Sequence, residues 1–229
     1  EQAQTQPFQV LPKIYQIELT NRCNLKCPMC LRTTDMERAE DMLNMELLRL
    51  MHARGDFGGS AYVELQMAGE PTLHPQLGEV VTFLHDEVGV MVGLSTHGLL
   101  MGKKKGVVAA LLELEALTIS VDSVDPDVYH QMRYPAKLEQ LYASLGYFFA
   151  AFKARRDEGK PVPFVELQLV KTALVEGSGD VDALRAEMQR RGWEQFAAIR
   201  VTGDCFVEMQ GRARVTGPRS GTMCMNPFS

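Results

Sequence analysis

The sequence predicts an α/β fold, in which six parallel strands with helices outside them form a partial (β/α)6, TIM-like barrel. Three observations predict it: apolar runs of strand length alternate with longer amphipathic runs, the apolar runs are rich in Val, Ile and Leu, and the strand–helix order repeats. The chain has 229 residues, 45% of them hydrophobic, which is enough for one buried core. In such folds the functional residues lie at the C-terminal ends of the strands.

The expected elements follow one another in a regular order along the chain. We expect strands over residues 14–20, 61–67, 90–95, 117–122, 164–171 and 197–202, because these runs have the composition of buried strands. We expect helices over residues 45–54, 75–87, 103–114, 138–158 and 180–191. Asn44 is a suitable N-cap for the first helix, and Pro75 suits the first turn of the second.

The composition argues against nucleic-acid and membrane partners. The formal net charge is -5, and the basic run at 103–105 is short, so we expect it to solvate the start of a helix rather than to bind phosphate. No apolar stretch approaches the roughly 18 residues of a membrane span, and the first residues lack the apolar core of a signal peptide. We therefore expect a cytoplasmic protein with reduced cysteines, in which a tight cysteine cluster indicates a metal rather than disulfides.

Three cysteines, Cys23, Cys27 and Cys30, follow the first expected strand directly. Thiolates so close together can converge on one metal centre only in a loop, and two kinds of site fit them. A zinc site normally closes with four ligands, so a distant Cys205, Cys224 or a histidine would have to complete it. An iron–sulfur cubane held by three cysteines instead leaves one iron open to a small chelating ligand.

The C-x3-C-x2-C spacing of these cysteines resembles the signature of the radical S-adenosylmethionine (SAM) superfamily. The resemblance implies that they hold a [4Fe–4S] cluster whose open iron binds the amino and carboxylate groups of SAM. It also implies that an electron from the cluster, delivered by a donor such as flavodoxin or ferredoxin, breaks a carbon–sulfur bond. That cleavage releases methionine and a 5′-deoxyadenosyl radical.

Two segments at the ends of the next expected strands extend the resemblance. The Ala-Gly-Glu-Pro sequence at 68–71 is similar to the family's GGEP motif, which implies that Gly69 and Glu70 contact the amino group of SAM. The Ser-Thr-His-Gly sequence at 95–98 is similar to the family's Ser/Thr-Asn-Gly, which implies that Ser95 and Thr96 lie beside the ribose or methionine part of SAM. His97 replaces the usual Asn, and we expect it only to line the site.

The fourth and fifth expected strands supply further candidate cofactor contacts. Ser120, Asp122 and Arg133 resemble the family's S-x-D…H-x-x-R block, and the first two share one strand face. The resemblance implies that Ser120 hydrogen-bonds SAM and that Arg133 pairs with its carboxylate, which a guanidinium group suits well. Asp122 is a candidate contact or a structural cap, and Gln168 resembles a strand residue that faces SAM. The sequence singles out no catalytic acid, base or hydrogen donor.

The tail over residues 203–229 is broken by Gly and Pro and resembles the start of a SPASM or twitch extension. In such extensions a cysteine before a Pro-Phe or Pro-Trp pair binds an auxiliary cluster. The resemblance implies that Cys224, and with it Cys205, binds a second [4Fe–4S] cluster, whereas two buried structural thiols are the alternative. We predict a radical SAM core domain over residues 1–202 and the start of this extension over 203–229.

The resemblance implies an enzyme of the oxidoreductase, epimerase or peptide-modifying type. Its substrate would be a polar small molecule of the sugar or aminocyclitol type, or a peptide, and hydrogen abstraction would lead to oxidation, epimerisation or cross-linking. Two alternatives stay open: a non-catalytic zinc or iron–sulfur binding module, and a radical SAM methyltransferase. Because the cofactors carry the chemistry, the protein's task is to orient the substrate, exclude water and tune the cluster.

Overall fold

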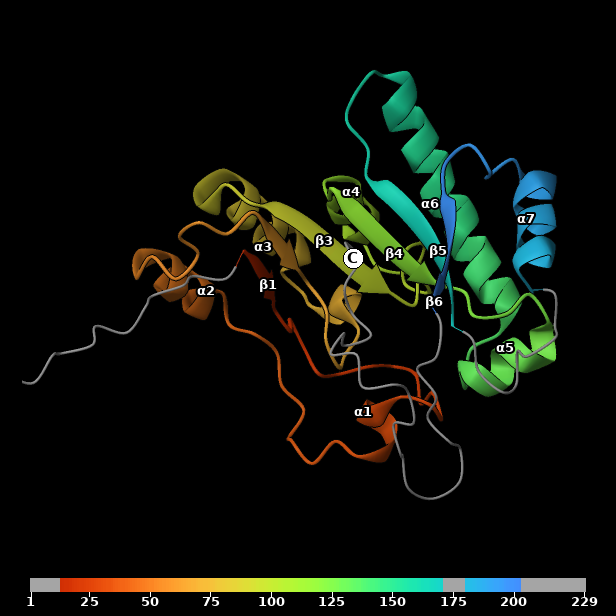
Figure 1. Ribbon diagram of the computed structural model, residues 1–229, viewed down its shortest axis with the longest axis horizontal. Helices are drawn as coiled ribbons and strands as arrows, with labels where there is room; N and C mark the ends of the chain where they lie inside the picture. Colours follow the sequence, from red (N-terminus) through yellow and green to blue (C-terminus); the bar gives the residue numbers. More distant parts are fainter. Residues whose placement is uncertain (1–12, 171–179, 203–229) are drawn as a thin grey trace, which may run out of the picture.

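One sheet of six parallel strands forms the centre of the computed structural model, which describes residues 13–170 and 180–202 (Figure 1). Each strand pairs with the next one along the chain. Among the described residues the first and last strands are the two edges, so the barrel is open. This is the partial TIM-like α/β barrel that the sequence predicts. The strands are β1 (Ile14–Gln16), β2 (Tyr62–Glu64), β3 (Met91–Thr96), β4 (Ala116–Ser120), β5 (Phe164–Val170) and β6 (Ala198–Thr202).

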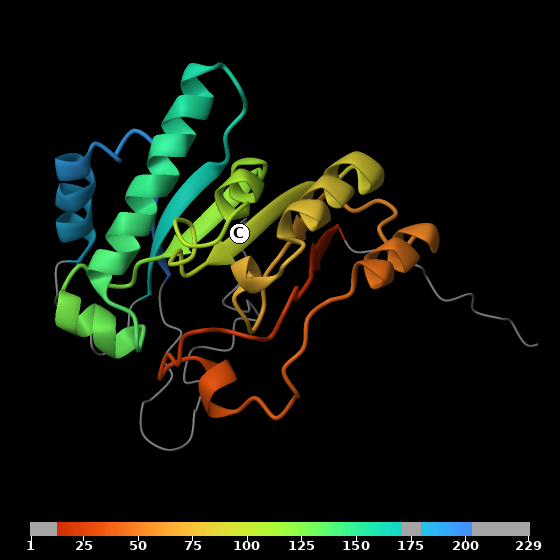
Figure 2. The same ribbon diagram turned by 180° about the vertical axis from the view of Figure 1, so that it is seen from behind.

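Helices follow the strands and cover the outer face of the sheet. Figure 2 views the molecule from the side on which α3, α4 and α6 run along the strands. A short 3-10 helix and a π-helical segment supplement the α-helices. The helices are α1 (Leu31–Thr34), α2 (Met45–Ala53), η1 (Pro71–Leu73), α3 (Leu77–Phe83), η2 (Leu84–Val88), α4 (Val107–Leu112), α5 (Pro126–Met132), α6 (Leu138–Asp157) and α7 (Asp180–Arg191).

The strands separate an apolar outer face from a more polar inner face. In β4, Leu117 and Ile119 are fully buried against the helices, whereas Thr118 and Ser120 are only half-buried on the opposite face. The register places Ser120 beside Gln168 of β5. Because successive strand residues point to opposite faces, one face builds the core and the other is left to line a site.

Three elements differ from the sequence expectation. The helix expected over 103–114 spans only α4, because Gly106 adopts a φ of +84°, which is left-handed. The helix expected from Pro75 begins at Leu77 and ends in the π-helical segment η2. The helix α5 was not expected, although Asp125 caps it by accepting hydrogen bonds from two backbone N–H groups at 2.9 and 3.0 Å. The N-cap predicted at Asn44 is confirmed, since its side chain accepts from the Glu46 N–H at 2.9 Å.

Within residues 13–170 and 180–202, no helix is both long enough and apolar enough to cross a lipid bilayer. The extension predicted over 203–229, with Cys205 and Cys224, lies outside the residues that the structure describes. The division into a core domain and an extension therefore stays a prediction.

Candidate functional site

A cavity of about 380 Å³ runs along the inner face of the sheet, and its size lies in the range of small-molecule sites. Strands β2 to β6 and the loop that carries the three cysteines all contribute to its lining. Among the predicted site residues, Asp122 is fully buried and is not part of the lining. The predicted residues that line the cavity are Cys23, Cys27, Cys30, Gly69, Glu70, Ser95, Thr96, Ser120, Arg133 and Gln168.

The cysteine loop, residues 21–30, leads from β1 to the short helix α1 at the C-terminal end of the sheet. Two backbone hydrogen bonds fix it: the Lys26 N–H donates to the Tyr134 carbonyl at 2.7 Å, and the Cys30 N–H donates to the Cys27 carbonyl at 3.1 Å. The Cys27 side chain is buried, whereas those of Cys23 and Cys30 are half-buried. All three cysteines belong to the lining of the cavity.

The environment of the thiols fits metal binding better than nucleophilic catalysis. Burial raises the pKa of Cys23 to about 11, although the Leu25 N–H donates to its Sγ at 3.4 Å and opposes the shift. Burial also raises the pKa of Cys27, against the lowering effect of Arg133. A thiol that stays protonated is a poor nucleophile, whereas a bound metal deprotonates the thiols that coordinate it.

The part of the chain that the structure describes contains no complete zinc site. There, no three His, Cys, Asp or Glu side chains lie close enough together to hold one metal ion. A zinc ion would need its ligand atoms at about 2.0–2.3 Å. In a cubane cluster each thiolate binds a different iron atom, so the sulfur atoms need not converge on one point.

The loop after β2 packs tightly against the cysteine loop at Gly69. A Cβ atom on Gly69 would lie 2.0 Å from the Thr20 carbonyl oxygen and 2.7 Å from the Arg22 carbonyl oxygen. The neighbouring Glu70 N–H donates to the same Arg22 carbonyl at 2.8 Å. Glycine is therefore required for the two backbones to come this close, and the contact fixes one loop against the other.

Replacing Gly69 with Ala is expected to lower the free energy of unfolding by about 1–3 kcal/mol, because the added methyl group overlaps backbone atoms. Denaturant unfolding measures the change. Gly78→Ala in α3 is a matched control, since its new Cβ would meet only the Ala110 Cβ, at 4.0 Å. That control should stabilise the chain by up to about 1 kcal/mol. Equal effects of the two substitutions would contradict the steric argument.

The Glu70 carboxylate is 2% exposed and is occupied by protein donors. It accepts hydrogen bonds from the N–H and hydroxyl of Thr72 at 3.1 and 2.5 Å, from the Thr96 hydroxyl at 2.6 Å and from the His97 N–H at 2.9 Å. A carboxylate has about four lone-pair sites. The side chain therefore joins the loop after β2 to the end of β3.

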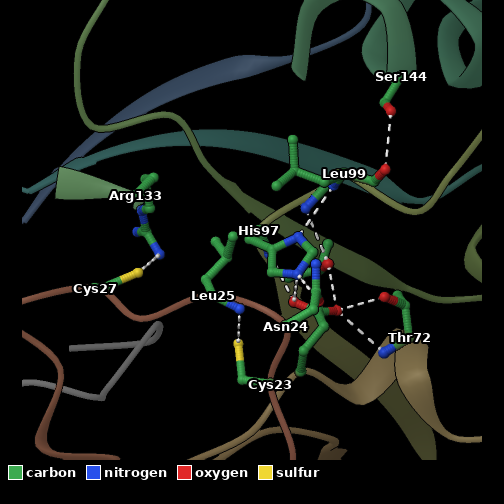
Figure 3. A network of polar contacts seen from close by, with 12 residues as sticks. Cys23, Asn24, Leu25, Cys27, Thr72, His97, Leu99, Arg133 and Ser144 are labelled. Carbon is green, nitrogen blue, oxygen red and sulfur yellow. Dashed lines mark hydrogen bonds and ion pairs between the residues drawn. The ribbon is translucent and has the colours of Figure 1, made fainter. Parts of the chain in front are cut away.

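His97 connects this network to the cysteine loop (Figure 3). Its ring Nδ1 accepts a hydrogen bond from the Leu99 N–H at 3.1 Å, and its Nε2 lies 2.9 Å from Oδ1 of Asn24. Burial lowers the pKa of His97, although the nearby Glu70 opposes the shift, so the ring is neutral. The sequence indicates a residue that lines the site, and the structure adds a specific link to Asn24.

Arg133 and Asp122 form a buried ion pair beyond the end of β4. Two guanidinium nitrogens, Nε and Nη2, contact Asp122 Oδ2, and Nη1 lies 4.0 Å from the Cys27 Sγ (Figure 3). Asp122 has a φ of +63°, and its other oxygen accepts from the Val170 N–H at 3.3 Å. Burial disfavours the charged guanidinium, but attraction to Asp122 and Cys27 outweighs it and raises the pKa of Arg133.

A protein-family model described as the Radical SAM superfamily matches residues 17–155. This span includes the cysteine loop, Gly69, Glu70 and the ion pair of Arg133. The chain belongs to the radical SAM superfamily. As a radical SAM enzyme it uses a [4Fe–4S] cluster and SAM as cofactors.

Curated relatives of this radical SAM chain match part of its length. It is 31% identical over 146 residues to a GTP 3′,8-cyclase of Corynebacterium glutamicum (strain R). This alignment covers 59% of this chain and 38% of the cyclase. It is 28% identical over 110 residues to a tungsten-containing aldehyde ferredoxin oxidoreductase cofactor-modifying protein of Pyrococcus furiosus, covering 48% of this chain and 31% of that protein. The chain thus spans less than half the length of these two relatives.

Two solved structures with bound SAM share the fold. Streptococcus suis SuiB bound to SAM superposes with a TM-score of 0.65 at 16% identity, covering 86% of this chain and 42% of SuiB. The structure of anSMEcpe with bound AdoMet gives a TM-score of 0.60 at 16% identity, covering 88% of this chain and 56% of that one. At this identity the likeness shows a common fold.

Lys104 has a role that its sequence context does not indicate. Its Nζ donates to the carbonyl oxygens of Thr72, Leu73 and His74 at 3.1, 2.7 and 3.2 Å. It therefore caps the end of η1, which follows Glu70, instead of solvating the start of a helix. No local pattern could predict this contact, because it joins residues about 30 positions apart.

Acidic and basic side chains from the strands also line the cavity. Glu64 accepts hydrogen bonds from the Tyr62 hydroxyl at 2.7 Å and the Ser95 hydroxyl at 3.0 Å, and Arg200 pairs with Glu166 at 3.2 Å. Burial raises the pKa of Glu64, against the effect of its two hydroxyl donors. The alternation of residue types along β2 and β6 is the sequence signal that could have identified Glu64 and Arg200.

Proposed function

We propose that Cys23, Cys27 and Cys30 hold the [4Fe–4S] cluster of an enzyme that acts on a polar small molecule of the sugar or aminocyclitol type, or on a peptide. The joint placement of these thiols and the candidate SAM contacts along one cavity carries the proposal. When bound, the cluster and SAM supply reductive cleavage of a carbon–sulfur bond and a 5′-deoxyadenosyl radical for hydrogen abstraction. Oxidation, epimerisation and cross-linking are the outcomes that this chemistry allows.

The protein's own residues orient SAM along the inner face of the sheet. The backbone around Gly69 packs against the cysteine loop, and its carbonyl oxygens would accept from the SAM amino group. Ser120 and Gln168, which are neighbours in the sheet register, present polar groups from β4 and β5. Arg133 would hold the carboxylate of SAM, because Asp122 takes up its Nε and Nη2 and leaves the Nη1 edge available. Ser95 and Thr96 border the same space from β3.

The charges of the cavity support a neutral or cationic polar substrate. Among the described lining residues, both guanidinium groups already pair with a carboxylate, Arg133 with Asp122 and Arg200 with Glu166. Apart from the Nη1 edge of Arg133, which the proposed SAM contact would use, a triphosphate such as that of GTP would therefore find no uncommitted arginine or lysine among the described lining residues. Hydroxyl and ammonium groups, in contrast, are suitable donors to the Glu64 and Glu166 carboxylates.

Reductive SAM cleavage tests the proposed function. Anaerobic reconstitution with iron and sulfide, followed by reduction and addition of SAM, is expected to yield 5′-deoxyadenosine and methionine. Chromatography with mass spectrometry measures both products. With a deuterated sugar, aminocyclitol or peptide substrate, deuterium should enter 5′-deoxyadenosine.

A sample without SAM and a sample without reductant serve as controls. Absence of 5′-deoxyadenosine from cluster-loaded, reduced protein would overturn the proposal. Stoichiometric zinc in place of iron and sulfide would favour the binding-module alternative. Transfer of a labelled methyl group from SAM to the product would indicate a methyltransferase instead.

A further inference from the structure

The cysteine loop contacts the end of β3 through two side chains, Asn24 and His97. Asn24 directly follows Cys23, and its Oδ1 lies 2.9 Å from the His97 Nε2. The two residues are 73 positions apart in the chain. Figure 3 shows the imidazole ring between the cysteine loop and the backbone at Leu99. The contact therefore bridges the loop that carries the thiols and the sheet that supports it.

The hydrogen bonds determine which ring nitrogen carries the proton. The Leu99 backbone N–H can only donate, so the His97 Nδ1 at 3.1 Å must accept and carries no proton. A neutral imidazole then has its proton on Nε2, which donates to the Asn24 oxygen. The Glu70 carboxylate, 3.4 Å from Nε2 and 2.9 Å from the His97 backbone nitrogen, favours the same tautomer.

The ring has no room to adopt another arrangement. His97 is 4% exposed and Glu70 is 2% exposed. The next residue, Gly98, has a φ of +75°, and a Cβ there would lie 2.9 Å from the Ile119 side chain. The backbone that follows the ring is thus closely packed, and the Nε2–H group points from the end of β3 to the cysteine loop.

We propose that His97 is a positioning residue, whose Nε2–H holds Asn24 and thereby fixes the cysteine loop in the conformation that receives the cluster. This inference rests on the proposed role of Cys23, Cys27 and Cys30. The family often has an Asn at this place, but an Asn side chain ends at the level of the ring Nδ1 and does not reach Asn24. The longer imidazole makes the bridge possible here.

Two substitutions separate the two hydrogen bonds of the ring. His97→Asn keeps an acceptor for the Leu99 N–H but removes the donor to Asn24. His97→Gln places an amide donor near the position of Nε2 but removes the acceptor for Leu99. If His97 positions the loop, His97→Asn should be the more harmful change for the loop. If it only caps the backbone at Leu99, His97→Gln should be the more harmful one.

Hydrogen–deuterium exchange of the full chain as purified, without added cluster, gives the first readout. In His97→Asn the amides of residues 21–30 are expected to exchange about tenfold faster, which corresponds to the roughly 1.4 kcal/mol that a tenfold change represents. His97→Gln should leave this segment near the wild-type rate. Faster exchange of the segment in His97→Gln alone, or unchanged exchange in both variants, would overturn the proposal.

The reconstituted protein gives the second readout. A chelator should remove iron about tenfold faster from His97→Asn than from His97→Gln, a size typical of losing a group that supports metal ligands. Asn24→Ala should reproduce the His97→Asn effect, and combining both changes should add little, because they remove the same contact. Additive effects would contradict the proposed link. If no cluster forms in any variant, the proposed function fails, while the exchange experiment still decides the role of His97.

Discussion

Replacing Cys27 with Ala is expected to abolish cluster binding and SAM cleavage. Cys27 is 6% exposed and lies between the other two thiols in the cysteine loop. With only two thiols left in this loop, a cubane would have two irons without a protein ligand there, and it should not persist. Iron and sulfide content, the cluster absorbance near 400 nm and the yield of 5′-deoxyadenosine should all fall to background.

Met29→Leu is the matched control for this substitution. Met29 lies in the same loop and lines the same cavity, and a Met-to-Leu exchange conserves volume. This variant should therefore retain the cluster, while Cys23→Ala and Cys30→Ala should behave like Cys27→Ala. Full iron content in any of the three cysteine variants would exclude that cysteine as a ligand.

The auxiliary cluster predicted from the tail is tested by the same measurement. Cys224→Ala should lower the iron content but leave the first cluster and SAM cleavage detectable. An unchanged iron content in this variant would show that Cys224 does not bind a second cluster.

The positions of the strands could be predicted from the sequence, but not all of their ends could. All six expected strands are present, because a buried parallel strand has a distinctive local composition. The strand expected over 14–20 stops at Gln16, however, and Thr20 forms an isolated antiparallel bridge with Met42 instead. Strand ends depend on partners that are distant in the sequence, and so composition alone does not determine them.

The candidate site shows the same division between local and distant information. The cysteine spacing is local, and it indicated a metal centre and the family. The contacts that hold the centre are distant: Asn24 meets His97 across 73 positions, and Cys27 meets Arg133 across 106. Glu70 illustrates the consequence, since its motif indicated a cofactor contact while its carboxylate is occupied within the protein.

Replacing Arg133 with Met should lower the free energy of unfolding by about 3–5 kcal/mol, because it leaves a buried carboxylate without its partner. That carboxylate belongs to Asp122, which is fully buried, so water cannot replace the guanidinium. Denaturant unfolding of the full chain measures the loss. The loss should be much smaller in the double variant Asp122→Asn with Arg133→Met, since no buried charge then remains.

Arg38→Met is the matched control, because Arg38 pairs with Glu18 while its own side chain is 59% exposed. The Glu18 side chain is 16% exposed, so water reaches this pair mainly from the Arg38 side, and we expect it to contribute at most about 1 kcal/mol. If Arg133→Met lowers the free energy of unfolding by no more than Arg38→Met does, the ion pair with Asp122 does not stabilise the fold. If Arg133→Met lowers the free energy of unfolding strongly and the double variant regains most of it, the buried Asp122 carboxylate needs Arg133 as its partner. Arg133 would then have two tasks at once, because the guanidinium that neutralises Asp122 also presents its Nη1 edge to Cys27 and the cavity.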